Sequence, residues 1–130
     1  MIVIDASALL EALIDTPAGG LVRHRILSEG SVAAPHLLDL EVAQVLRRLR
    51  RIGDISESRA AEALSDLADL PIERHPHLLL MPRIWALRGQ LSAYDASYVA
   101  LAELWDATLL TSDRRLAAAA GVAVNIEVVA

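Results

Sequence analysis

The stretch Ile2-Val3-Ile4-Asp5-Ala6-Ser7 decides the fold, because a run of β-branched residues leads directly into a segment rich in Ala and Leu. The run Ile2–Ile4 predicts a short buried strand, and residues 8–14 predict a helix with Ser7 as its N-cap. A strand that passes straight into a helix is the unit from which parallel α/β sheets are built. The N-terminus therefore predicts an α/β fold.

The rest of the chain continues this alternation. Residues 36–52 predict a long amphipathic helix that Gly53 ends, because its apolar stripe recurs at spacings of three and four: Leu38, Val42, Val45, Leu49 and Ile52. The other expected helices cover residues 17–28, 56–70, 79–87, 92–105 and 113–120, and the other strands 32–34, 71–74, 108–111 and 122–129. We expect Thr16 to cap the first of these helices and Gly121 to close the last. This order predicts one domain over residues 1–130, a three-layer α/β/α sandwich with a mostly parallel central sheet.

Composition excludes several classes of chemistry. The 130 residues include 55% apolar ones, enough for one core, and carry a net charge of −5. All 12 basic residues are Arg, so Schiff-base and P-loop lysine chemistry are excluded, and the lack of Cys excludes disulfides and thiolate nucleophiles. The longest stretch without Asp, Glu or Arg, residues 116–126, is too short to span a membrane, and the N-terminus does not resemble a signal peptide. We expect a cytoplasmic protein.

Two carboxylates follow predicted strands. Asp5 ends the first strand and Asp113 follows the strand over 108–111, and ligands in open α/β sheets bind beyond the carboxyl ends of the strands. Each Asp also has a simpler interpretation as a helix N-cap. Asp95 has the same two interpretations, since Ser92 and Asp95 resemble a capping box.

Glu41 is different because it lies in the middle of a predicted helix. It shares the apolar stripe of Leu38 and Val45, where a carboxylate must be paired, protonated or metal-bound. Alternatively it lies on the rim of that stripe with Arg48 as its partner. Four carboxylates at one edge of a sheet would repel one another, and hard cations such as Mg²⁺ or Mn²⁺ remove that repulsion. The four together predict a metal-dependent nuclease site.

Four motifs contain these carboxylates. They are Met-Ile-Val-Ile-Asp5-Ala-Ser, Leu-Asp-Leu-Glu41-Val-Ala, Leu-Ser-Ala-Tyr-Asp95-Ala-Ser-Tyr-Val-Ala and Leu-Leu-Thr-Ser-Asp113-Arg-Arg-Leu. Together, in this order and at these spacings, they resemble the PIN-domain ribonucleases, and more narrowly the VapC toxins of bacterial type II toxin–antitoxin pairs. Each motif alone is weak, but the set is specific and runs over essentially the whole chain.

The resemblance implies a Mg²⁺- or Mn²⁺-dependent endoribonuclease that cuts structured RNA, typically tRNA or rRNA, and blocks translation. The residues that match the acidic quartet of the family are Asp5, Glu41, Asp95 and Asp113. In the family the first and third of these are the usual direct metal ligands, and the other two act more often through water. Ser7 matches the residue that supports the first carboxylate, and Thr111 or Ser112 the hydroxyl beside the last. The family also forms homodimers and is held inactive by a small VapB-type antitoxin.

Arginine supplies every basic contact available for RNA. We favour Arg114 and Arg115 for phosphates because they directly follow Asp113. The group Arg47, Arg48, Arg50 and Arg51 either binds phosphates or forms a solvated face near a helix C-terminus. Tyr94 either touches the substrate or packs in the core.

Two other functions fit the same fold class. One is a catalytically inactive PIN-fold module that only binds a partner protein, although such a module has no need to keep four acids. The other is a phosphotransfer receiver, which the lack of Lys and of an acidic pair near the first strand disfavours.

Overall fold

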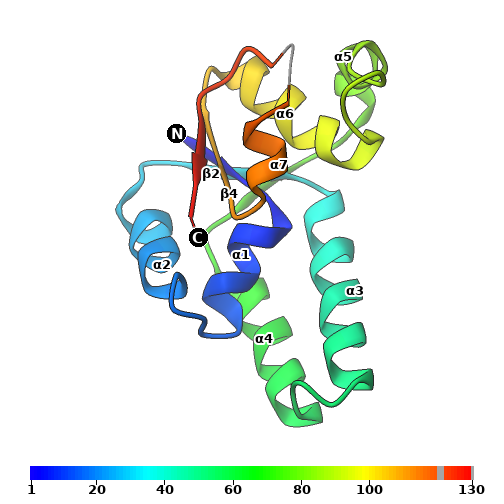
Figure 1. Ribbon diagram of the computed structural model, residues 1–130. Coiled ribbons are helices and arrows are strands. Elements are labelled where there is room, and N and C mark those ends of the chain that lie inside the picture. The colour runs from blue at the N-terminus through cyan, green and yellow to red at the C-terminus, as the bar shows by residue number, and fades with distance from the viewer. Residues whose placement is uncertain (120–121, 130) are drawn as a thin grey trace.

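The computed structural model describes residues 1–119 and 122–129, and its described strands form one sheet (Figure 1). They are β1 (Ile2–Ile4), β2 (Val32–Pro35), β3 (Glu73–His75), β4 (Thr108–Thr111) and β5 (Ile126–Val128). The sheet order is β3-β2-β1-β4-β5, and each pair of neighbours runs parallel. The predicted parallel sheet is confirmed.

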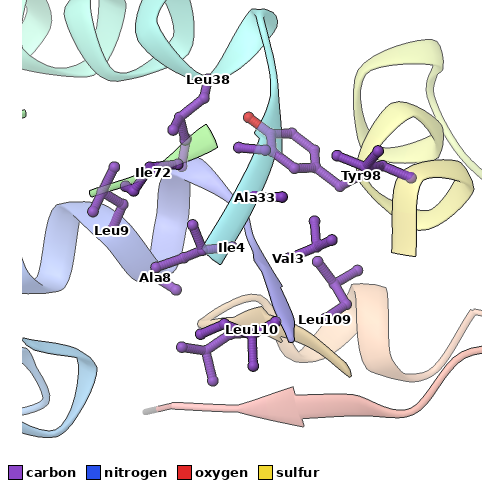
Figure 2. Close-up of a cluster of buried hydrophobic side chains, with 14 of the residues drawn as sticks. Val3, Ile4, Ala8, Leu9, Ala33, Leu38, Ile72, Tyr98, Leu109 and Leu110 are labelled. Atoms are coloured by element: carbon purple, nitrogen blue, oxygen red, sulfur yellow. The ribbon is translucent and has the colours of Figure 1, made fainter. Parts of the chain in front are cut away.

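Helices cover both faces of this sheet. They are α1 (Ala6–Leu13), α2 (Gly19–Ser28), α3 (Leu37–Arg51), α4 (Glu57–Asp69), the 3₁₀ turn η1 (Leu78–Leu80), α5 (Met81–Ala86), α6 (Ala93–Trp105) and α7 (Arg114–Ala117). Helix α1 packs against α2, α3, α4 and β4, and α6 packs against β1, β2, β4 and α5. Figure 2 shows α1 and α6 on opposite sides of β1. The α/β/α sandwich expected from the sequence is therefore confirmed.

Strand β1 lies at the centre of the core. Its residues Val3 and Ile4 are fully buried. Val3 lies toward Tyr98 of α6 and Ile4 toward Ala8 of α1 (Figure 2), because successive side chains of a strand point to opposite faces. A strand that is covered on both faces needs a continuous apolar run, which residues 2–4 supply.

Three predicted helix ends are wrong. Helix α1 is capped by Asp5, not Ser7: Asp5 has extended backbone angles and accepts a hydrogen bond from the Ala8 amide at 3.0 Å. Helix α2 begins at Gly19, not residue 17, and the Thr16 hydroxyl donates to the Glu11 carbonyl instead of capping. Helix α7 ends at Ala117, short of residue 120, and the expected closing residue Gly121 lies outside the described part of the chain.

Smaller differences concern two strands and one apolar stripe. Strand β3 lies one to two residues later than residues 71–74, and β5 covers only the last part of residues 122–129. On α3, Ile52 just beyond the helix is 59% exposed, whereas Leu46, absent from the predicted stripe, is buried. No helix within the described ranges combines the length and hydropathy needed to cross a membrane.

Candidate active site

The four carboxylates predicted from the sequence line one hollow of about 450 Å³. They are Asp5, Glu41, Asp95 and Asp113. Asp5 directly follows β1, Asp113 lies two residues after β4, Glu41 lies on α3 after β2, and Asp95 lies in the first turn of α6. Because the strands are parallel, the carboxyl ends of β1, β2 and β4 meet at one edge of the sheet. The topology therefore brings four separate segments of the chain to the same place.

Asp5 is the most deeply buried of the four, with 6% of its surface exposed. Its Oδ1 accepts hydrogen bonds from the Ser7 hydroxyl at 2.6 Å and the Ala8 amide at 3.0 Å, and its Oδ2 accepts one from the Thr111 hydroxyl. Burial raises the pKa of Asp5, the hydrogen bonds oppose that rise, and the charge of Asp95 adds to it. The same carboxylate caps α1, so both interpretations of Asp5 from the sequence are compatible.

Hydroxyl groups connect the two strand ends. The Ser7 Oγ lies 3.2 Å from the Thr111 Oγ1 and accepts a hydrogen bond from the Ser112 amide at 3.0 Å. The Thr111 Oγ1 also accepts one from the Asp113 amide at 3.0 Å. Ser7 and Thr111 thus contact Asp5 through their side chains, whereas Ser112 contributes its backbone N–H. This network fixes the turn after β1 against the turn after β4.

Glu41 is partly buried and paired, and its partner is not the Arg48 of the rim interpretation. The Tyr98 hydroxyl donates a hydrogen bond to the Glu41 Oε1 at 2.6 Å. No ion pair joins Glu41 to Arg48, although Arg48 lines the same hollow. Burial raises the pKa of Glu41, the hydrogen bond from Tyr98 opposes that rise, and the charges of Asp95 and Asp5 add to it.

Tyr98 is the residue of this hollow that sequence reasoning missed. Its side chain is 1% exposed, and its hydroxyl reaches the site from α6. The sequence did contain one signal: Tyr98 follows Asp95 by three residues, so both lie on one face of the helix. Burial and the Glu41 carboxylate raise the pKa of Tyr98, which keeps its hydroxyl protonated as a donor.

Asp95 and Asp113 combine helix capping with a place in the hollow. The Ser92 hydroxyl accepts a hydrogen bond from the Asp95 amide at 3.1 Å, as the capping interpretation predicts. Asp113 caps α7 by accepting from the Arg115 amide at 2.9 Å. Burial and the charge of Asp113 raise the pKa of Asp95. The Arg115 guanidinium, 3.3 Å from Asp113 Oδ1, lowers the pKa of Asp113.

The donor set of the hollow suits a hard divalent cation. The four candidate ligands are all carboxylates, and three of them have pKa values raised by burial and by one another's charge. Across residues 1–119 and 122–129, no group of three or more His, Asp or Glu side chains is arranged to hold a metal ion by itself. Mg²⁺ is commonly bound through one or two carboxylates and several waters. This arrangement fits an ion of that kind better than a zinc site.

The basic residues are divided between different surfaces. Arg48 is exposed, lines the acidic hollow and has no ion-pair partner among the described residues. Arg47, Arg50 and Arg51 line a separate hollow between α3 and α4. Arg114 and Arg115 are both exposed on α7, and Arg115 borders a smaller hollow that also contains Asp95 and Asp113.

Tyr94 does not pack in the core. Its side chain is 61% exposed, although it directly precedes Asp95 in the first turn of α6. The expectation of core packing is wrong because Tyr94 lies in the first turn of α6, which is exposed, whereas the buried part of the helix begins at Ala96 and includes Tyr98.

The chain matches the model of the PIN domain over residues 2–122. Ribonuclease VapC1 of Mycobacterium tuberculosis is 44% identical to it over 128 residues, which cover 98% of this chain and 96% of the relative. A solved structure from Pyrobaculum aerophilum has a TM-score of 0.73 at 29% identity, and the match covers 98% of this chain and 83% of the Pyrobaculum chain. A chain of a toxin-antitoxin complex from Klebsiella pneumoniae has a TM-score of 0.71 at 18% identity, and the match covers 100% of this chain and 98% of the Klebsiella chain. The chain therefore belongs to the PIN domain family and, within it, to the VapC group.

Proposed function

We propose that this protein is a Mg²⁺- or Mn²⁺-dependent endoribonuclease toxin that cleaves structured RNA, tRNA or rRNA, and so inhibits translation. The observation that carries the proposal is the convergence of Asp5, Glu41, Asp95 and Asp113 on one hollow. Carboxylates that raise one another's pKa form a site with an excess of negative charge, which a divalent cation would offset. The relative VapC1 carries the name ribonuclease.

In this proposal the chain's own residues hold and orient the reacting groups. Asp5 and Asp95 would hold the metal directly, and Glu41 and Asp113 would act through water. The chemistry that a bound Mg²⁺ or Mn²⁺ would supply here is a lowered pKa of a water molecule and stabilisation of the charge on the leaving oxygen. Ser7 and Thr111 fix the Asp5 carboxylate through hydrogen bonds. The four acids titrate as a coupled group, so we assign the role of general base to none of them alone.

The remaining features of the proposal concern partners. We propose that residues 1–130 act as one domain, that the protein forms a homodimer and that a cognate VapB-type antitoxin neutralises it. A fold neighbour from Klebsiella pneumoniae that is part of a toxin-antitoxin complex supports an antitoxin partner. Arg114 and Arg115 remain candidates for RNA phosphates, because both are exposed beside Asp113.

The experiment uses full-length protein freed of antitoxin and incubated with tRNA and rRNA. We expect cleavage with Mg²⁺ or Mn²⁺ and none with EDTA, and 5′-end sequencing of the fragments identifies the cut sites. Asp5→Asn and Asp95→Asn should abolish cleavage while the proteins stay folded by circular dichroism. Cleavage that persists in EDTA, or full activity of either variant, would refute the proposal.

The alternative is a module of the same fold that binds a partner without catalysis. Isothermal titration with Mn²⁺ separates the two functions, because the nuclease needs a metal site and the binding module does not. Absence of Mn²⁺ binding by antitoxin-free protein favours the binding module.

A further inference from the structure

The hydroxyl of Tyr98 connects the interior of the protein to the acidic hollow. The Tyr98 ring lies among the buried side chains between α6 and the sheet (Figure 2), and its hydroxyl donates to the Glu41 Oε1 at 2.6 Å. The two residues are 57 positions apart and lie on different helices, α6 and α3. The hydrogen bond therefore fixes a side chain of one helix from the other.

The support of Glu41 differs from that of Asp5. Three donors from the protein hold the Asp5 carboxylate, one of them a backbone amide. Among the described residues, the hydrogen bond from Tyr98 is the only one that reaches the Glu41 carboxylate. The Glu41 Oε2 therefore remains available for a cation or a metal-bound water. Loss of the Tyr98 hydroxyl leaves a long, flexible side chain with no anchor.

Packing alone does not account for a tyrosine at this position. A phenylalanine fills the same volume in a 1% exposed site, and a buried hydroxyl is unfavourable unless it is hydrogen-bonded. The partner of this hydroxyl is a carboxylate of the hollow. From this geometry we infer that Tyr98 is a positioning residue, which holds Glu41 so that its carboxylate reaches the metal through water. The inference rests on the proposed metal-dependent function.

The chain offers a matched control for the test. Tyr94 lies on the same helix, one turn before Tyr98, but its side chain is exposed and its hydroxyl makes no hydrogen bond with any described residue. Tyr98→Phe and Tyr94→Phe each remove one oxygen atom from α6. The probe is Mn²⁺ alone, titrated by calorimetry into the full chain free of antitoxin, so the readout does not depend on RNA cleavage.

Substituting a residue that orients a metal ligand commonly weakens metal binding 10- to 100-fold. We expect Tyr98→Phe to raise the Kd for Mn²⁺ by about 10-fold or more, and Tyr94→Phe to leave it unchanged. In a Glu41→Ala background, Tyr98→Phe should produce no further weakening, because the group that it positions is absent. Circular dichroism and thermal unfolding show whether each variant is folded.

Several outcomes overturn the inference separately from the proposed function. If the wild type binds Mn²⁺ and cleaves RNA while Tyr98→Phe binds Mn²⁺ equally well, only the role of Tyr98 is refuted. The same holds if Tyr98→Phe weakens binding equally in the Glu41→Ala background. Should Tyr98→Phe fail to fold, Glu41→Ala alone decides, since unchanged Mn²⁺ affinity of that variant refutes the inference. A wild type that binds no Mn²⁺ and cleaves no RNA refutes both.

Discussion

Replacing Asp5 by Asn should stabilise the metal-free protein while abolishing its activity. The buried carboxylate is unfavourable because burial and the charge of Asp95 both raise its pKa. Asn keeps an oxygen that accepts from the Ser7 hydroxyl and the Ala8 amide. Its NH₂ group then faces the Thr111 hydroxyl, which is free to donate to the Ser7 Oγ at 3.2 Å instead. The substitution thus removes a charge while the Ser7 and Thr111 hydroxyls keep hydrogen-bond partners.

The gain in stability depends on pH. Because the pKa of Asp5 in the folded state is raised above its usual value of about 3.8, the folded state binds this proton more tightly than the unfolded state. Wild-type stability therefore falls as the pH rises from about 3.8 through the folded-state pKa. Within that range of pH, wild-type stability falls by about 1.4 kcal/mol per pH unit, or about 5 °C in Tm for a chain of this length. We expect Asp5→Asn to unfold at a higher temperature than the wild type at pH 7, with the difference vanishing near pH 4.

Thermal unfolding in EDTA, followed by circular dichroism between pH 4 and 8, measures this difference. Asp113→Asn is the control of opposite sign, because the Arg115 guanidinium lowers the pKa of Asp113 and the wild-type carboxylate is favourable at pH 7. Asn still caps α7, so Asp113→Asn should show a small loss of stability that added salt reduces. A Tm of Asp5→Asn equal to or below that of the wild type at pH 7 would contradict the reasoning.

Three further predictions test the metal, the substrate path and the packing of α1 on α2. Mn²⁺ at 100 times its Kd should raise the unfolding free energy of the wild type by about 2.7 kcal/mol, measured by urea denaturation, but not that of a variant that cannot bind it. Arg48→Ala should reduce the slope of log kcat/KM for RNA against log salt concentration by about 0.7, because one phosphate contact is lost. Arg51 lies outside the acidic hollow, so Arg51→Ala should leave this slope unchanged. Equal slopes in the two variants would refute a contact between Arg48 and an RNA phosphate. Gly19→Ala should lower the free energy of unfolding by about 1–3 kcal/mol, because the added Cβ would overlap the Glu11 carbonyl. At Gly20 the added Cβ meets open space, so Gly20→Ala should change the free energy of unfolding by less than about 1 kcal/mol.

The sequence predicted those parts of the site that depend on which residue directly follows a strand along the chain. A carboxylate directly after a β-branched strand, such as Asp5, lies at the carboxyl edge of a parallel sheet wherever that sheet forms. The partner of Glu41 was not predictable in this way, since contact with Tyr98 depends on how α3 and α6 face each other across 57 residues. Spacing on one helix identifies Tyr98 as a neighbour of Asp95 but says nothing about α3.

Errors at the helix ends have similar physical causes. Asp5 and Ser7 are both good N-cap residues, and the direct passage from β1 into α1 selects the first of them. Residues 117–120 are alanines, which favour a helix, yet within α7 only Leu116 is buried. Because a short helix depends on the burial of an apolar face more than on propensity, α7 ends early.

The acidity of the chain gains a different meaning once the four carboxylates are located. Without them the other 13 acidic residues nearly balance the 12 arginines, so most of the net charge of −5 belongs to one hollow. Several of the other acids are paired, for example Glu103 with Arg83 at 2.6 Å and Asp39 with Arg74 at 2.9 Å. In the proposed nuclease, a divalent cation bound in the hollow would remove much of this excess where an RNA phosphate approaches. An acidic protein is therefore compatible with a polyanionic substrate, provided that the metal binds before or with the RNA.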